Sequence, residues 1–158
     1  MALMRHHLDR RGCDGIEVVS AGVSAVIEAP ASRPAVRVLR DRGIDLTDHR
    51  ARHLTRAELE RADLVVVMAQ EHVDAIRALA PEALVKVARL KDLAGRSVTP
   101  APGMDLAGRL QALLAATPPA SLAGLDVADP YGRSLQSYAT TAEEIERGVD
   151  ALVQALCG

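Results

Sequence analysis

The stretch that decides the fold is Leu-Val-Val-Val-Met at residues 64–68, an unbroken apolar run with three successive valines. Strands of this kind are buried on both faces, as in a parallel sheet covered by helices. Residues 84–90 (LVKVARL) alternate at Val85 and Val87 and predict a second strand, and residues 16–19 (IEVV) predict another. Since helical patterns separate these strands, we expect an α/β fold with a parallel sheet.

Apolar residues three or four positions apart predict the helices between and after the strands. Gly12 is predicted to end the first helix, Thr55-x-x-Glu58 is a capping box that would open a short one, and Thr140 or Thr141 would open the last. The predicted inward faces are Leu3, Met4, His7 and Leu8; Ala35, Val38 and Leu39; Val73, Ile76 and Leu79; Leu106, Leu110, Leu113 and Leu114; and Ile145, Val149, Leu152, Val153 and Leu156.

The composition indicates a single intracellular domain over residues 1–158. Two Tyr and no Phe or Trp leave aliphatic side chains to build the core. Residues 92–125 are rich in Ala, Gly, Pro and Leu, and we interpret them as an inserted helical segment. The net charge of −2 indicates no affinity for nucleic acid or for a membrane surface. Because no apolar run can span a bilayer and no signal peptide is recognisable, we expect a cytoplasmic location.

The two cysteines, Cys13 and Cys157, follow no disulfide framework, which is typical of a reducing compartment. A phosphatase thiolate needs a helix amino terminus after it and an arginine six positions on. The residue six positions after Cys13 is Val19, and only Gly158 follows Cys157, so both are interpreted as ordinary thiols. His49 is flanked by arginine rather than by further metal ligands, and neither a metal nor a cofactor is predicted.

The most informative motif is Asp129-Pro130-Tyr131-Gly132. Asp, Pro and Gly are preferred at the first, second and fourth positions of a type I turn, so a plain turn is the first interpretation. A rigid proline turn can also hold a carboxyl group in a fixed direction. Asp129 could then give its proton to a leaving oxygen while Tyr131 forms one wall of a cleft.

Four segments, in this order, resemble the low-molecular-weight protein tyrosine phosphatase family: residues 18–22 (VVSAG), 30–52 (with RGIDL at 42–46 and DHRAR at 48–52), 63–68 (DLVVVM) and 129–132 (DPYG). The resemblance implies a flavodoxin-like parallel sheet with helices on both faces. It also implies cysteine-based hydrolysis of a phosphotyrosine protein or a similar phosphomonoester. Asp129 would be the general acid and base, Tyr131 a residue of the substrate cleft, and His49 part of the network that supports the phosphate loop. It implies nothing about the oligomeric state.

The sequence contains no Cys-x5-Arg phosphate loop, which in this family precedes the helix that begins here at Met1. We therefore expect that the start was assigned too far downstream, which removes the nucleophile and the first central strand. We also expect the 158 residues to be inactive, because preorganised charge stabilisation is usually the largest catalytic contribution. Residues 16–19 and 64–68 would then have unpaired strand edges. A non-catalytic pseudophosphatase that binds or regulates a partner, and a relative of arsenate reductases, are the alternatives.

Overall fold

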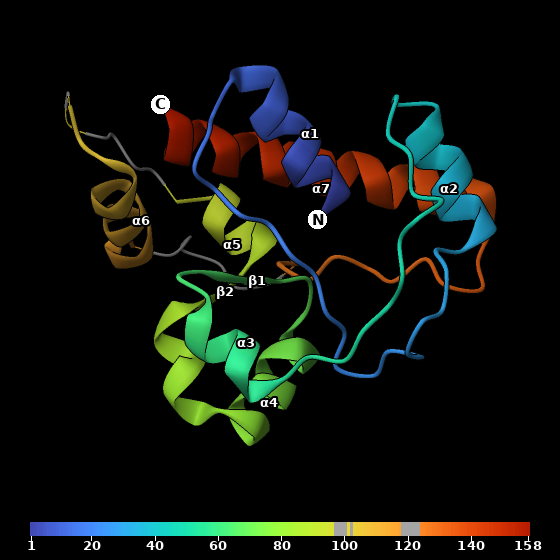
Figure 1. Ribbon diagram of the computed structural model, residues 1–158, viewed down its shortest axis with the longest axis horizontal. Helices are drawn as coiled ribbons and strands as arrows, with labels where there is room; N and C mark the ends of the chain where they lie inside the picture. Colours follow the sequence, from blue (N-terminus) through green and yellow to red (C-terminus); the bar gives the residue numbers. More distant parts are fainter. Residues whose placement is uncertain (97–100, 102, 118–123) are drawn as a thin grey trace.

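The structure, a computed structural model, describes residues 1–96, 101, 103–117 and 124–158. At its centre lie two short parallel strands, β1 (Val65–Val67) and β2 (Val87–Arg89), with Val65 opposite Val87 and Val67 opposite Arg89 (Figure 1). Both predicted strands are confirmed, although each is shorter than predicted. The second is shortened because Pro81–Lys86 forms a 3-10 helix (η1) ahead of it.

The predicted strand at residues 16–19 is wrong, since the structure has no strand there. An extended segment counts as a strand only when its backbone pairs with another strand, and within the described residues the sheet ends at β1 and β2. The carbonyl oxygen of Val18 instead accepts hydrogen bonds from the guanidinium of Arg5, from Nε at 2.9 Å and also from Nη2. One edge of β1 therefore has no strand beside it in the described part of the chain.

Seven α-helices are described, and most agree with the periodicity of the sequence. Gly12, at a φ of 60°, ends the first helix as predicted, and the capping box between Thr55 and Glu58 is confirmed. The helix predicted within residues 92–125 is present as α6, while residues 97–100, 102 and 118–123 lie outside the described residues. The helices are α1 (Ala2–Arg11), α2 (Arg33–Arg40), α3 (Arg56–Arg61), α4 (Gln70–Leu79), α5 (Leu90–Ala94), α6 (Leu106–Ala115) and α7 (Leu135–Cys157).

The predicted start of the last helix at Thr140 or Thr141 is wrong, because α7 begins at Leu135. Ser134 caps it, since the Ser134 side chain accepts a hydrogen bond from the backbone N–H of Ser137 at 3.2 Å. Serine is as good an N-cap as threonine or better, so the earlier cap extends the helix by more than one turn. Thr141 lies inside α7 and donates its hydroxyl to the Ala128 carbonyl oxygen at 3.4 Å.

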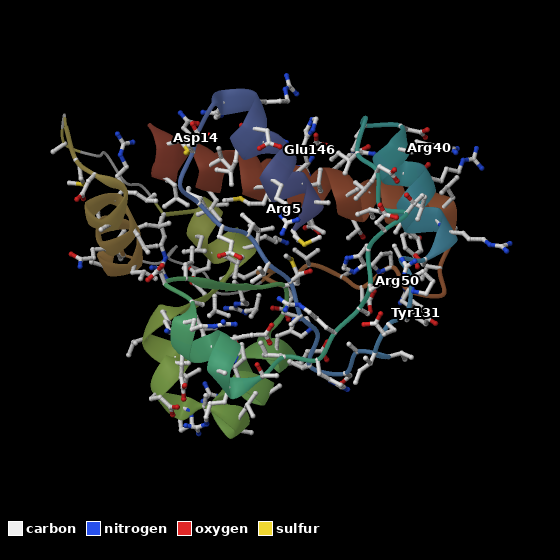
Figure 2. All side chains as sticks on the ribbon, viewed as in Figure 1. Arg5, Asp14, Arg40, Arg50, Tyr131 and Glu146 are labelled. Carbon is white, nitrogen blue, oxygen red and sulfur yellow. A yellow bond between two sulfur atoms is a disulfide. The ribbon has the colours of Figure 1, made fainter. Side chains whose placement is uncertain are left out.

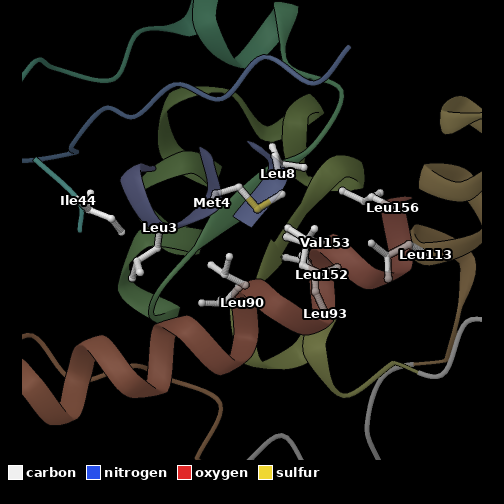
Figure 3. Packing of buried hydrophobic residues seen from close by; sticks show 12 residues of the cluster. Leu3, Met4, Leu8, Ile44, Leu90, Leu93, Leu113, Leu152, Val153 and Leu156 are labelled. Atoms are coloured by element: carbon white, nitrogen blue, oxygen red, sulfur yellow. The ribbon is translucent and has the colours of Figure 1, made fainter. Parts of the chain in front are cut away.

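The sheet separates two hydrophobic clusters, and helices cover both of its faces (Figure 1). On one face α1, α5, α6 and α7 pack together, with Leu90, Leu113 and Val153 almost wholly buried (Figure 3). On the other face, α3 and α4 pack Leu59 and Ile76 against Val67. Among the described residues, the large side chains that are fully buried are all aliphatic, as the composition predicted.

The two cysteines are joined in a disulfide with an Sγ–Sγ distance of 2.02 Å, so their interpretation as ordinary thiols is wrong. Cys13 follows α1 and Cys157 ends α7, and the packing of these two helices brings their carboxyl ends together. A separation of 144 residues along the chain gives no regular spacing from which the pairing could be recognised.

Candidate active site

The Asp129 loop is attached to the carboxyl ends of both strands. The backbone N–H of Val127 donates to the carbonyl oxygen of Met68, just beyond β1, at 2.8 Å. Asp126 Oδ1 accepts two hydrogen bonds, from the N–H of Gln70 at 3.0 Å and from Nη1 of Arg89 at 3.1 Å. In open parallel α/β sheets, ligands bind beyond the carboxyl ends of the strands, so this loop lies where a site is expected.

Contacts to α7 hold the other side of the same loop. Lys91 Nζ donates to the Asp126 carbonyl oxygen at 3.2 Å and to Glu144 Oε1 at 2.7 Å. Asp126, Arg89 and Lys91 therefore fix the loop, and the sequence analysis missed all three. Leu125 and Val127 are buried on either side of the exposed Asp126, and this alternation is the signal that could have indicated an anchored extended segment.

The Asp129-Pro130-Tyr131-Gly132 motif forms a turn, but one residue later than predicted: it closes between Pro130 and Arg133, with Gly132 at its third position, so the predicted type I turn over residues 129–132 is wrong. Asp129 Oδ1 accepts a hydrogen bond from the Tyr131 N–H at 2.9 Å, and the Arg133 N–H donates to the Pro130 carbonyl oxygen at 2.9 Å. Gly132 has a φ of 72°, which favours glycine. Asp129 is exposed and Tyr131 is 79 % exposed, so both side chains are available to a ligand from solvent. The turn and an available carboxylate thus occur together.

His49 lies in a separate loop that pairs with residues 22–30. Pro30 and Arg50 form an antiparallel bridge, and the Ala51 N–H donates to the Ala29 carbonyl oxygen at 2.9 Å. Arg50 and Tyr131 lie on the same side of the molecule, away from Asp14 (Figure 2). No hydrogen bond joins the side chains of His49, Asp129 and Tyr131 in the described structure, so the supporting role of His49 stays a prediction.

A hydrogen bond also shapes the start of the His49 loop. The Thr47 N–H donates to Asp45 Oδ1 at 2.8 Å. This backbone hydrogen bond lowers the pKa of Asp45 below its ordinary value. The carboxylate of Asp45 therefore closes a local turn before His49.

The disulfide lies at the opposite end of the longest helix from the acid loop. With 23 residues at 1.5 Å each, α7 is about 34 Å long. Ala128, next to Asp129, contacts Thr141 inside α7, and the stretch of helix from Thr141 to Cys157 is about 24 Å long, so the sulfur atoms lie on the order of 20 Å from the carboxylate. Neither sulfur can attack a phosphate held at Asp129.

No three side chains of His, Cys, Asp or Glu among the described residues come together as metal ligands. None of the described helices is long and apolar enough to cross a membrane.

The comparisons with known proteins agree with this geometry. The family profile "Low molecular weight phosphotyrosine protein phosphatase" matches residues 1–107. The probable low molecular weight protein-tyrosine-phosphatase EpsP of Ralstonia nicotianae is 31% identical over 95% of this chain and 83% of its own length. A protein-arginine-phosphatase of Geobacillus stearothermophilus is 30% identical over 94% and 82%.

A solved structure extends the agreement to the fold. The low molecular weight protein tyrosine phosphatase from T. tengcongensis superposes with a TM-score of 0.74 and 32% identity, covering 97% of this chain and 86% of that one. The parallel sheet with helices on both faces is therefore the flavodoxin-like fold of these phosphatases, and the chain belongs to the low molecular weight phosphotyrosine protein phosphatase family.

Proposed function

We propose that these 158 residues supply the proton donor and the substrate-binding surface of a phosphatase that acts on phosphotyrosine in proteins. One observation carries the proposal: the exposed carboxylate of Asp129 sits in a proline turn that is hydrogen-bonded to the carboxyl end of the sheet. Such a carboxyl group has a fixed direction and free access to a ligand. Tyr131 would line the cleft, and His49 would support a phosphate loop from below.

In the proposed reaction a cysteine thiolate attacks phosphorus, and the bond from phosphorus to the phenol oxygen breaks. Protonated Asp129 gives its proton to that oxygen as it leaves. The resulting carboxylate then takes a proton from the water that hydrolyses the phosphocysteine. The sequence contains no Cys-x5-Arg loop to supply the thiolate and hold the phosphate, so the 158 residues by themselves should not turn over aryl phosphates.

The test adds the missing chemistry to the chain. An amino-terminal extension designed with one apolar strand and a Cys-x5-Arg loop is fused before Met1, and p-nitrophenyl phosphate hydrolysis is followed. We expect the fusion to be active and Asp129→Asn to lower kcat about 100-fold or more, as is typical for loss of a general acid. Asp14→Asn removes an exposed carboxylate on the other side of the molecule and should leave kcat unchanged. An equal effect of both variants would contradict the role of Asp129.

The relatives differ in the phosphorylated residue that their names specify. One is a probable tyrosine phosphatase and another a protein-arginine-phosphatase. The same fusion should therefore be assayed on a phosphotyrosine peptide and on a phosphoarginine peptide of the same sequence. A kcat/KM that favours the phosphoarginine peptide would contradict the proposed substrate while leaving the role of Asp129 intact.

A non-catalytic binding or regulatory module is the second candidate, and the absence of a Cys-x5-Arg loop from the sequence favours it. This candidate predicts that the 158-residue protein melts cooperatively and is inactive on aryl phosphates. A protein that aggregates or melts without a transition would count against it. Arsenate reduction is disfavoured, because the two cysteines pair at the far end of α7 from Asp129.

A cytoplasmic location is likewise a proposal. Disulfides are rare in the cytosol, so this location requires that the Cys13–Cys157 pair be reduced there for much of the time. Alkylation of thiols in freshly lysed cells, followed by mass spectrometry, measures the reduced fraction. A fully oxidised pair would contradict a cytoplasmic location.

A further inference from the structure

The outer face of α2 carries a row of arginines without acidic partners. Arg33, Arg37 and Arg40, here called the arginine stripe, are exposed and share one face of the helix. With Val36 they line a shallow hollow of about 220 Å³. None of the three forms an ion pair with a carboxylate of the described residues, whereas neighbouring Arg42 is paired with Glu146 at 3.1 Å.

The arginine stripe does not help the helix to form. Arginines three or four positions apart on a helix repel each other, and α2 has no acidic residue in its first turn to offset this. Arg33 also opposes the positive end of the helix dipole. The opposite face of α2 is the one that packs, with Val38 buried against Tyr138 and Ala142. Since the arginine stripe weakens the isolated helix, its charge is better explained by a bound anion.

The arginine stripe begins beside the acid loop. Ser32, just before α2, donates its hydroxyl to the Tyr138 hydroxyl at 3.3 Å, and Tyr138 is in the first turn of α7 after the Asp129 turn. From there α2 runs along the amino-terminal half of α7 (Figure 1), and Arg40 lies on the same side of the molecule as Arg50 and Tyr131 (Figure 2). A chain that enters the site at Tyr131 can therefore continue along α2.

We propose that the arginine stripe binds an acidic segment of the protein substrate, next to the residue that enters the site. This inference rests on the proposed function for the identity of that residue. Along the helix axis Arg33 and Arg37 are about 6 Å apart and Arg37 and Arg40 about 4.5 Å apart, whereas alternate side chains of an extended peptide repeat at about 6.8 Å, a difference that the long, exposed arginine side chains can cover. The whole arginine stripe is about 10 Å long and holds three cations. It fits a short peptide with alternating Glu or Asp, and it is too small for the six to ten phosphate contacts typical of DNA binders.

The test measures peptide binding to the 158-residue protein by fluorescence anisotropy at low salt. The probe is a labelled ten-residue peptide with an unphosphorylated Tyr followed by three alternating Glu, and the reference peptide has Gln in place of Glu. We expect the Glu peptide to bind at least about tenfold more tightly, and the difference to shrink at 150 mM salt because exposed charges are screened. Equal affinities for the two peptides would overturn the proposal.

Three variants locate the site. The triple variant R33Q/R37Q/R40Q should bind the Glu peptide at least about fivefold more weakly, whereas R33K/R37K/R40K keeps the charge and should bind within about twofold of the unmodified protein. The matched control R10Q/R61Q/R147Q makes the same change in net charge at exposed arginines elsewhere. If R33Q/R37Q/R40Q and R10Q/R61Q/R147Q lose the same affinity for the Glu peptide, the effect is one of net charge and the proposal is overturned. Tighter binding of a DNA oligomer that has the same charge as the peptide would also overturn it.

The peptide affinities do not depend on the phosphatase chemistry. Neither peptide carries a phosphate and no turnover is measured, so failure of the arginine stripe would leave the Asp129 experiment untouched. Failure of Asp129→Asn to lower kcat would, in turn, leave the peptide affinities as they are. Circular dichroism of each variant verifies that α2 and the rest of the fold are retained.

Discussion

Breaking the Cys13–Cys157 disulfide should remove a large share of the stability of this chain. The pair closes a loop with a sequence separation of 144 residues, almost the whole polypeptide. In the chain-entropy treatment, the lost entropy of the unfolded state is 2.1 + 1.5R ln n cal/mol/K, which gives about 5 kcal/mol at 25 °C for a loop of this length. Because domains of this size unfold with about 5–15 kcal/mol, reduction should remove a third or more of the stability.

Urea unfolding with and without a phosphine reductant measures this directly. With a slope of about 2 kcal/mol/M, loss of 5 kcal/mol lowers the midpoint by about 2.5 M. The double variant C13S/C157S should unfold near the midpoint of the reduced protein and should not respond to reductant. The mass of the protein before reduction verifies that the disulfide is present. If the urea midpoint of this protein does not fall when the reductant is added, the entropic argument is refuted. Free thiols in air-oxidised protein would refute the pairing itself.

Three smaller changes test individual contacts. Gly148→Ala places a methyl group 2.7 Å from Leu90 Cγ, where α7 crosses α5. This variant should lower the free energy of unfolding, measured in urea, by about 1–3 kcal/mol. An unchanged urea midpoint would show that the two helices can separate without cost. Thr55→Ala removes the cap of α3 and should cost about 1 kcal/mol at pH 7. Burial raises the pKa of Glu58, but hydrogen bonds from Thr55 and the nearby Arg52 and Arg61 outweigh it, so the pKa of Glu58 lies below 4.5 in the folded protein. The stabilisation from ionised Glu58 is thus present above pH 4.5 and is lost as the pH falls through the lowered pKa. The difference in free energy of unfolding between Thr55→Ala and the unmodified protein should therefore shrink in acid. A difference that stays constant with pH would contradict the ionised cap. Asp126→Asn weakens the hydrogen bonds that attach the acid loop to Gln70 and Arg89. Chymotrypsin should therefore cleave this variant faster after the exposed Tyr131, which mass spectrometry follows. An unchanged cleavage rate would show that Asp126 does not hold the loop.

The parts of the fold that could be predicted from the sequence depend on neighbours in the chain. The apolar run at residues 64–68, the Thr55–Glu58 capping box and the stop at Gly12 are local patterns, and each is found in the structure. The start of α7 was predicted wrongly because two caps compete, and Ser134 prevails over Thr140 and Thr141.

The parts that could not be predicted depend on residues far apart in the chain. Whether residues 16–19 form a strand depends on a partner strand, and the Cys13–Cys157 pairing depends on how α1 packs on α7. At the candidate site, a turn next to Asp129 could be predicted from neighbouring residues, although it closes between Pro130 and Arg133 rather than within residues 129–132. Its attachment through Asp126 to Arg89 could not, because those two residues are 37 positions apart. The position of His49 relative to Asp129 is a tertiary relation of the same kind.

The division of the core by a sheet of two three-residue strands has a dynamic consequence. The cluster around Leu59 and Ile76 is smaller than the cluster on α7, and both cysteines of the disulfide pack against the larger cluster. The α3–α4 side should therefore open as a separate cooperative unit, with a lower free energy of amide hydrogen exchange than α7. Because Met68 and Gln70 hold the acid loop from that side, each such opening would also release the proton donor for a moment, which links the lifetime of the site to the least stable part of the molecule.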